Sequence, residues 1–398
     1  MNSLRNVLLS LLLLASGSVQ AQAQSCATEP WWLWSLFTEH FIQDDGRVVD
    51  ASTPQLHSSS EGQSYAMFFA LLANDPATFE RLWRWTVSNL AGGDISQNLP
   101  AWFWGKHSDG SWVVLDSNSA ADADLWFVYS LLEAGQRWQR QDYLDDAKRL
   151  LDNMEQREFA QMPGLGRMLL PGVNGFVQAD QLWVLNPSYL PLPVLRRIQR
   201  AAPHGPWAEV TGALPRLLRE GSPHGFAPDW LGYRAVAPQQ GMFVESNLRG
   251  GQGSYDAIRT YLWAGLTAAA DPAAADILRS LNGMVRAVAV TGMPPEKVNI
   301  AQGSTEGIGP FGFSAALLPY LQASGKPWLA EIQQRRVLSE LKASVTPERV
   351  KKAQPPYYDF VLSLFALGWS EQQFSFRPDG GIDLKWEKKC SQGATSSP

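Results

Sequence analysis

Ser58-Ser59-Ser60-Glu61-Gly62-Gln63-Ser64-Tyr65-Ala66-Met67 is the stretch that decides the fold, because it places one carboxylate at the start of an otherwise apolar helix. Its serines offer N-cap hydroxyls. The run from Tyr65 to Leu72 is apolar on every side, which is typical of a helix buried all round. Glu61 either complements the helix dipole, an effect of ~0.3–1 kcal/mol, or holds a proton that it can donate because partial burial raises its pKa.

Two further stretches repeat this pattern of acids that open an apolar helix. Asp122 and Asp124 lie at the start of the apolar run 120–138, and Asp256 lies at the start of the run 255–270. For each acid alone, pairing with the helix dipole is a sufficient explanation. Three matching instances instead indicate a shared chemical role.

Apolar and amphipathic helices alternate along the chain. The apolar segments predict inner helices at residues 62–73, 120–138, 189–200, 255–270, 309–321 and 358–368. The amphipathic segments predict outer helices at residues 31–43, 77–90, 143–159, 207–220, 273–290 and 328–343. Strand-like alternation is confined to short loops, at 112–115 and 242–245.

This alternation predicts an all-α fold that closes on itself. If the first helix pairs with the last, the chain forms six helical hairpins in a ring, an (α/α)6 barrel whose inner wall is made by the apolar helices. A two-layer helical solenoid is the alternative, but it requires a sequence repeat and none is found. In the barrel, the N-terminal ends of the inner helices meet at one mouth. Glu61, Asp122 and Asp256 should therefore converge there.

The first residues of the chain resemble a targeting segment. Arg5, an apolar core at 7–15 and small residues near Ala21 and Ala23 are typical of a secretory signal peptide, which we expect to span residues 1–23. We expect residues 24–398 to form a single exported domain, periplasmic or secreted. The two cysteines, Cys26 and Cys390, form either a disulfide between the termini or two free thiols.

Composition excludes several classes of partner. The formal net charge is −5, which argues against nucleic acid and anionic membranes. Beyond residue 23 no apolar run is long enough to span a membrane, so we expect no membrane insertion. The five histidines show no metal-ligand spacing, and we predict neither a metal nor a cofactor. We expect a monomer.

The aromatic residues and the acids together favour sugar chemistry. The chain has 17 tryptophans, and sugar rings stack on flat aromatic surfaces. Many of them must be core residues, but Trp102 and Trp104 stand in what we interpret as a polar loop between Pro100 and His107, a position that favours a ligand platform. Paired carboxylates suit glycoside hydrolysis, in which one acid protonates the leaving oxygen and the other activates water across ~6.5–9.5 Å in an inverting enzyme.

Five stretches of the chain resemble glycoside hydrolase family 8. They are Ser60-Glu61-Gly62-Gln63-Ser64-Tyr65, Leu99-Pro100-Ala101-Trp102-Phe103-Trp104-Gly105-Lys106, Ala120-Ala121-Asp122-Ala123-Asp124 through Ala134 and Trp138, Asn186-Pro187-Ser188-Tyr189, and Tyr255-Asp256-Ala257-Ile258-Arg259. The resemblance implies an (α/α)6 barrel and inverting cleavage of β-1,4-glucan. It is greatest to members that work alongside bacterial cellulose synthesis.

The resemblance also implies roles for individual residues. Glu61 corresponds to the proton donor, Asp256 to the base, and Asp122 to an acid that stabilises the sugar at the cleavage point. The family usually has Ser or Thr before that last acid, where this chain has Ala121. The substrate-binding candidates within the matched stretches are Trp102, Trp104, Tyr65, Tyr189, Tyr255 and Arg259.

The leading hypothesis is an exported endo-β-1,4-glucanase, or cellulase, that acts on cellulose chains during their synthesis and export and contacts the synthase or export machinery. Two alternatives stay open. The same fold could act on chitosan, lichenan or xylan, all of which are substrates within the family. A non-catalytic glucan-binding subunit would keep the aromatic residues but could lose the acids, and this chain retains all three.

Overall fold

The computed structural model of the chain describes residues 30–248 and 250–388. The predicted signal peptide, Cys26 and Cys390 lie outside these residues. Within them, no helix is both long enough and apolar enough to cross a bilayer.

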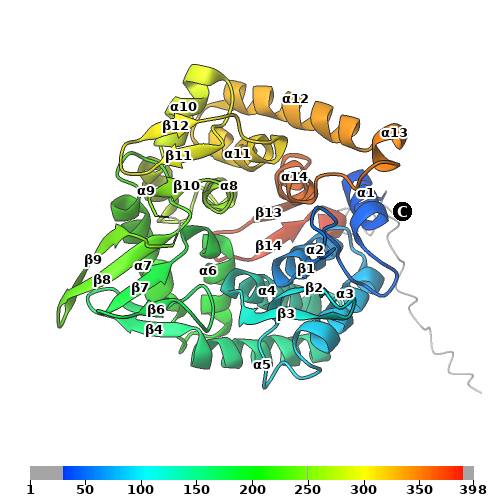
Figure 1. The fold of residues 1–398 in the computed structure, drawn as a ribbon, viewed down its shortest axis with the longest axis horizontal. Coiled ribbons are helices and arrows are strands. Elements are labelled where there is room, and N and C mark those ends of the chain that lie inside the picture. Colours follow the sequence, from blue (N-terminus) through cyan, green and yellow to red (C-terminus); the bar gives the residue numbers. More distant parts are fainter. Residues whose placement is uncertain (1–29, 249, 389–398) are drawn as a thin grey trace, which may run out of the picture.

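Two concentric sets of helices form the body of the molecule (Figure 1). The inner helices are α2 (Ser60–Leu72), α4 (Ala121–Arg137), α6 (Leu192–Ala201), α8 (Ala257–Leu266), α11 (Phe311–Ala323) and α14 (Tyr357–Ser370). The outer helices are α1 (Trp32–Phe41), α3 (Pro76–Leu90), α5 (Gln141–Arg157), α7 (Trp207–Gly221), α9 (Ala274–Ser280), α10 (Gly283–Thr291) and α12 (Pro327–Ser344). A 3-10 turn, η1 (Pro187–Tyr189), precedes α6, and the short α13 (Pro347–Val350) follows α12. The predicted (α/α)6 barrel is confirmed.

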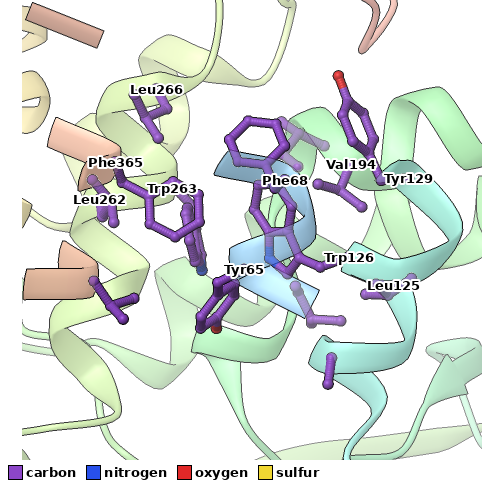
Figure 2. Packing of buried hydrophobic residues seen from close by; sticks show 14 of the residues in the cluster. Tyr65, Phe68, Leu125, Trp126, Tyr129, Val194, Leu262, Trp263, Leu266 and Phe365 are labelled. Atoms are coloured by element: carbon purple, nitrogen blue, oxygen red, sulfur yellow. The ribbon is translucent and has the colours of Figure 1, made fainter. Parts of the chain in front are cut away.

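Aromatic side chains from different inner helices meet at the centre of the ring (Figure 2). The ring of Phe365, on α14, lies 5.5 Å from that of Phe68 on α2, 5.2 Å from that of Trp126 on α4 and 5.1 Å from that of Trp263 on α8. Most inner helices are apolar on every side because one side packs on this centre and the other on the outer helices. The exception is α6, which carries Arg196, Arg197 and Arg200. The last inner helix thus closes the ring against the first.

The first and last helices pack together, as the alternation predicted. The rings of Phe41 on α1 and Phe360 on α14 lie 5.2 Å apart. Just beyond α14, Glu371 accepts hydrogen bonds from the indoles of Trp31, at 3.1 Å, and Trp32, at 3.0 Å.

A hairpin made by the last described residues fills the end of the ring at which the inner helices finish. Its strands are β13 (Phe374–Phe376) and β14 (Ile382–Leu384), drawn at the centre of Figure 1. Phe374 and Phe376 lie 5.4 and 6.2 Å from the ring of Phe68. Trp386 donates its indole N–H to the carbonyl of Leu71 at 3.1 Å, near the end of α2.

The structure contains more strand than the sequence predicted, all of it in small antiparallel sheets of two to four strands. The further strands are β1 (Ser58–Ser59), β2 (Ala101–Lys106), β3 (Trp112–Ser119), β4 (Phe159–Met162), β5 (Gly166–Leu169), β6 (Val177–Gln178), β7 (Leu182–Leu185), β8 (Leu231–Ala237), β9 (Gln240–Glu245), β10 (Gln252–Gly253), β11 (Lys297–Asn299) and β12 (Ser304–Glu306). The interpretation of Trp102 and Trp104 as loop residues was therefore wrong, because both lie in β2. Short strands that pair only with each other leave little periodicity in a sequence.

The prediction of a single helix at 273–290 is also wrong. This segment forms two helices, α9 and α10, and the second begins at Gly283, whose amide donates to the carbonyl of Gly225 at 2.9 Å. A Cβ atom on Gly283 would lie 2.5 Å from the carbonyl oxygen of His224. A distant backbone segment thus occupies the space that a continuous helix with a side chain at this position would need.

Candidate active site

Glu61 lies in the first turn of α2, at the mouth of the ring. Ser59 caps the helix by accepting the amide N–H of Gly62 at 3.0 Å, and Ser60 donates to Glu61 Oε2 at 3.3 Å. Residue 62 must be glycine, since a Cβ atom there would lie 2.5 Å from the hydroxyl of Tyr357. Burial raises the pKa of Glu61, although its hydrogen bonds and the charge of Arg259 oppose the rise. This direction favours the second of the two interpretations of Glu61, a carboxyl group that can hold a proton.

Asp122 is almost completely buried in the first turn of α4, with 1% of its surface exposed. Its Oδ2 atom accepts the hydroxyl of Tyr65 at 3.4 Å, and its Oδ1 atom accepts the amide of Ala123 at 2.9 Å. Tyr65 thus supplies a side-chain hydroxyl that Ala121 cannot provide. Burial, and next the charge of Glu61, raise the pKa of Asp122 well above its ordinary value.

Asp256 precedes α8 but does not cap it. The cap is Asp229, whose Oδ1 atom accepts the amides of Ser254 at 2.7 Å and Ala257 at 2.8 Å. Asp229 stands in a connection with no motif around it, so its role could not be predicted from the sequence. Because Asp229 satisfies the helix start, the carboxylate of Asp256 is available for other contacts, and 23% of its side chain is exposed.

Arg259 joins two of the three acids. Its Nη2 atom lies 3.2 Å from Asp256 Oδ1 and 3.7 Å from Asp122 Oδ2, and it also donates to Ser188 Oγ at 3.2 Å. Its Nη1 atom donates to the hydroxyl of Tyr358 at 3.1 Å. Glu61 is near enough for its pKa to respond to the charges of Arg259 and Asp256. The predicted convergence of the three acids is thus present in the structure, with a single arginine among them.

Comparisons with known proteins agree with this geometry. The family described as glycosyl hydrolases family 8 matches residues 1–372. The chain belongs to this family. It is 48% identical to the endoglucanase of Pseudomonas fluorescens (strain SBW25) over 93% of this chain and 94% of that one. It is 42% identical to the endoglucanase of Escherichia coli O157:H7 over 98% and 99% of the two chains. A crystal structure of the endo-1,4-D-glucanase of Vibrio fischeri ES114 superposes with a TM-score of 0.83 at 41% identity, covering 90% of this chain and 99% of that one.

Aromatic residues of this family 8 chain surround the acids. Tyr255 is 46% exposed, and its hydroxyl donates to Glu296 Oε1 at 3.1 Å. Tyr358 donates to the carbonyl of Tyr255 at 2.7 Å, which ties α14 to the start of α8. The ring of Tyr189 lies 5.8 Å from the guanidinium carbon of Arg259. The predicted binding residues Tyr189, Tyr255, Tyr65 and Arg259 are thus close to the acids.

Trp102 and Trp104 lie on hairpin β2–β3, beside the strand that leads into Glu61. Trp104 is paired with Ser58 of β1. Its ring stacks on that of Trp112 at 5.4 Å and meets the guanidinium of the buried Arg47 at 4.5 Å, while Trp102 stacks on Phe103 at 4.8 Å. Trp104 is thus held by its own neighbours, and Trp112, which is 42% exposed, presents more surface to solvent.

The acids of the mouth do not form a metal-binding group. Within residues 30–248 and 250–388, no cluster of three or more His, Cys, Asp or Glu side chains has a metal-binding arrangement.

Proposed function

We propose that this family 8 glycoside hydrolase is an endo-β-1,4-glucanase that cleaves β-1,4-glucan with inversion at the anomeric carbon. The endoglucanase activity is supported by relatives of that name that match nearly the whole chain at 42–48% identity. The observation that carries the mechanism is the convergence of Glu61, Asp122 and Asp256 around the single guanidinium of Arg259.

The environments of the acids suit different steps. Glu61 is the general acid in this proposal, because burial raises its pKa and favours the protonated form that must donate to the leaving oxygen. Asp256 is the general base, because it is partly exposed and ion-paired with Arg259, so water can reach a charged oxygen. One arginine cannot balance three carboxylates, and the group therefore holds a proton more readily than three separate acids would.

Asp122 takes neither of these roles. It is deeply buried and is held by Tyr65 and its own backbone, so there is little room for the attacking water beside it. We assign it to hydrogen bonds with the sugar at the cleavage point. Tyr255 and Tyr189 supply aromatic surface for neighbouring sugars, and hairpin β2–β3 extends that surface through Trp112 and Trp104.

The stereochemistry of the product tests the mechanism. An inverting enzyme releases the α-anomer from a β-linked glucan. We expect proton NMR of the first product, recorded before mutarotation, to show the α-anomer. A β-anomeric first product would require a covalent intermediate and would contradict these roles.

The glycan preference is a separate part of the proposal, because the barrel also suits the alternatives left open above. Reducing-end release from carboxymethylcellulose, lichenan, xylan and chitosan, measured side by side, should be greatest for a β-1,4-glucan. Reducing-end release from chitosan alone, or from xylan alone, would mean that this glycan and not cellulose is the substrate. No release from any of the four would favour a glucan-binding subunit.

We further propose that the enzyme is exported and trims cellulose chains during their synthesis. The proposal rests on the signal-like residues 1–23 and on the family resemblance. N-terminal sequencing of the protein recovered from the periplasm should begin after Ala21 or Ala23. In a cellulose-producing strain that lacks the enzyme, the wild-type gene should restore normal cellulose whereas the E61Q gene should not. Equal restoration by both would indicate a non-catalytic role.

A further inference from the structure

A second pair of acids lies behind the mouth and takes no part in the proposed chemistry. Asp124 follows Asp122 on α4, and Glu158 comes directly after α5. Both side chains are completely buried. Residues two apart on a helix point to different sides. Asp124 therefore points away from the side of α4 that carries Asp122.

The pair has no cation. No described residue forms a salt bridge with Asp124 or Glu158, and neither oxygen of Asp124 receives a hydrogen bond from a described donor. The positive charge of Arg157 acts on Glu158, but Arg157 is exposed and donates to the carbonyl of Gln97 at 3.2 Å. The other charged groups that act on Asp124 are Asp122 and Glu61, which are both acidic.

The two carboxyl groups are within hydrogen-bonding reach of each other. Two ionised carboxylates cannot hydrogen-bond, because both only accept. Burial raises the pKa of Glu158 to about 7, and burial together with Glu158 raises the pKa of Asp124 well above its ordinary value. A hydrogen bond between the two groups therefore requires a proton on one of them, and burial favours the protonated form of both.

Glu158 connects this pair to the start of α4. Its Oε1 atom accepts the hydroxyl of Ser119 at 2.5 Å, and Ser119 Oγ in turn accepts the amide of Val173 at 3.2 Å. The carbonyl of Glu158 accepts the amide of Leu170 at 2.7 Å. Ser119 stands three residues before Asp122, so this chain of hydrogen bonds fixes the turn from which Asp122 projects.

The loop at residues 170–173, which is also bonded to Glu158 and Ser119, packs tightly against the start of α4. The carbonyl of Pro171 accepts the amide of Ala121 at 3.0 Å. A Cβ atom on Gly172 would lie 2.3 Å from the carbonyl oxygen of Ser119. The start of α4 is thus held by this loop and by the hydrogen bond between Ser119 and Glu158 together.

We infer that Asp124 and Glu158 share one proton and act as positioning residues for Asp122. This inference rests on the proposed function of Asp122. The shared proton lets Asp124 donate to Glu158, and Glu158 then remains an acceptor for Ser119. Neither residue touches substrate, so the pair should affect kcat much more than KM.

The first test is spectroscopic and does not depend on catalysis. At about pH 8, above the pKa of about 7 of Glu158, the infrared spectrum of the wild type minus that of D124N should contain the C=O band of one protonated carboxylic acid. E133Q is the matched control, because Glu133 is a buried acid of the same helix that is ion-paired with Arg137 and Arg197. Its difference spectrum should lack that band. A wild-type minus D124N spectrum without the band would overturn the shared proton.

The second test is kinetic. D124N keeps a donor toward Glu158, and its kcat should stay within a few-fold of wild type. D124A removes the donor, and a displaced Asp122 should lower kcat by about 10²-fold while KM changes by a few-fold. S119A should reduce kcat by a smaller factor than D124A does. It should also be more stable to unfolding than D124A. Unchanged kcat in both D124A and S119A would overturn the positioning role. A wild type inactive on every glycan would instead refute the proposed function and leave the infrared result standing.

Discussion

The two ends of α4 place a buried acid in opposite surroundings. Near its C-terminal end, Glu133 lies between Arg197 and Arg137, whose contact with Glu133 Oε2 measures 2.6 Å. At its N-terminal end, Asp122 shares one arginine with Asp256 and Glu61. Both acids are 1% exposed. The end that only holds the fold together balances its charges, because Arg137 also pairs with Glu387 at 2.9 Å. The end with the proposed chemistry keeps an excess of acid.

The largest effect is expected from replacing the proposed proton donor at the mouth of the ring. Glu61→Gln keeps the shape of the side chain but cannot donate a proton to the leaving oxygen. We expect kcat on cellopentaose to fall by at least ~10³-fold, within the range of general acid catalysis, while calorimetry shows nearly unchanged oligosaccharide binding. Activity above a tenth of wild type would place the general acid elsewhere.

The balanced end should respond in stability instead. Glu133→Gln leaves Arg197 buried without its charge partner, and breaking such a pair costs about 3–5 kcal/mol. Urea unfolding should show this loss, while kcat of the folded fraction stays near wild type. A loss of kcat without a loss of stability would mean that the two ends do not divide their roles in this way.

Removing the shared arginine sharpens the comparison through pH. The charge of Arg259 opposes the rise in the pKa of Glu61. In Arg259→Met that pKa should rise further, so the alkaline limb of the kcat/KM profile, where Glu61 loses its proton, should move to higher pH. We also expect kcat at the optimum to fall by about 10²-fold, the effect of losing one preorganised charge. An alkaline limb that moves to lower pH would contradict the assignment.

The smallest effect is a gain in stability at the mouth. Because burial raises the folded-state pKa of Asp122, the stability linked to it is present below the unfolded value of ~3.9 and is lost as pH rises through the folded value. Asp122→Asn removes this loss. It should unfold less readily than wild type at neutral pH by about 0.5–2 kcal/mol, with no gain at pH near 3, and it should be a poor enzyme. If Asp122→Asn and wild type were equally stable at both pH values, the ionisation of Asp122 would not lower the stability of the folded protein.

The sequence predicted the ring and the acids for one physical reason. A helix that is apolar on every side, such as the one after Glu61, must be inner, and the inner helices of such a barrel run the same way. Their first turns therefore meet, which brought Glu61, Asp122 and Asp256 together. Residues such as Arg259 came only from the family resemblance, because an arginine inside an apolar helix gives no sign of its partners.

What the sequence missed depends on contacts between distant segments. Asp229 caps α8 from a connection 27 residues before Asp256 in the chain. Glu158 looks like one more charged residue at the end of an amphipathic helix, and only its burial against Ser119 and Asp124 sets it apart. The break at Gly283 likewise comes from a carbonyl of another segment. Periodicity records how a segment faces the core, and it contains no information about which segment lies opposite.

The hairpin β13–β14 has a consequence for the order in which the molecule folds. Its aromatic side chains complete the centre around Phe68, and Trp386 bonds to Leu71 across 315 residues of sequence. Helices α2 and α4 can form early from local contacts, but their inner faces stay open to water until the final strands arrive. A chain that lacks these strands would therefore expose the hydrophobic centre around Phe68. We expect the native core to form only once residues 374–386 are in place.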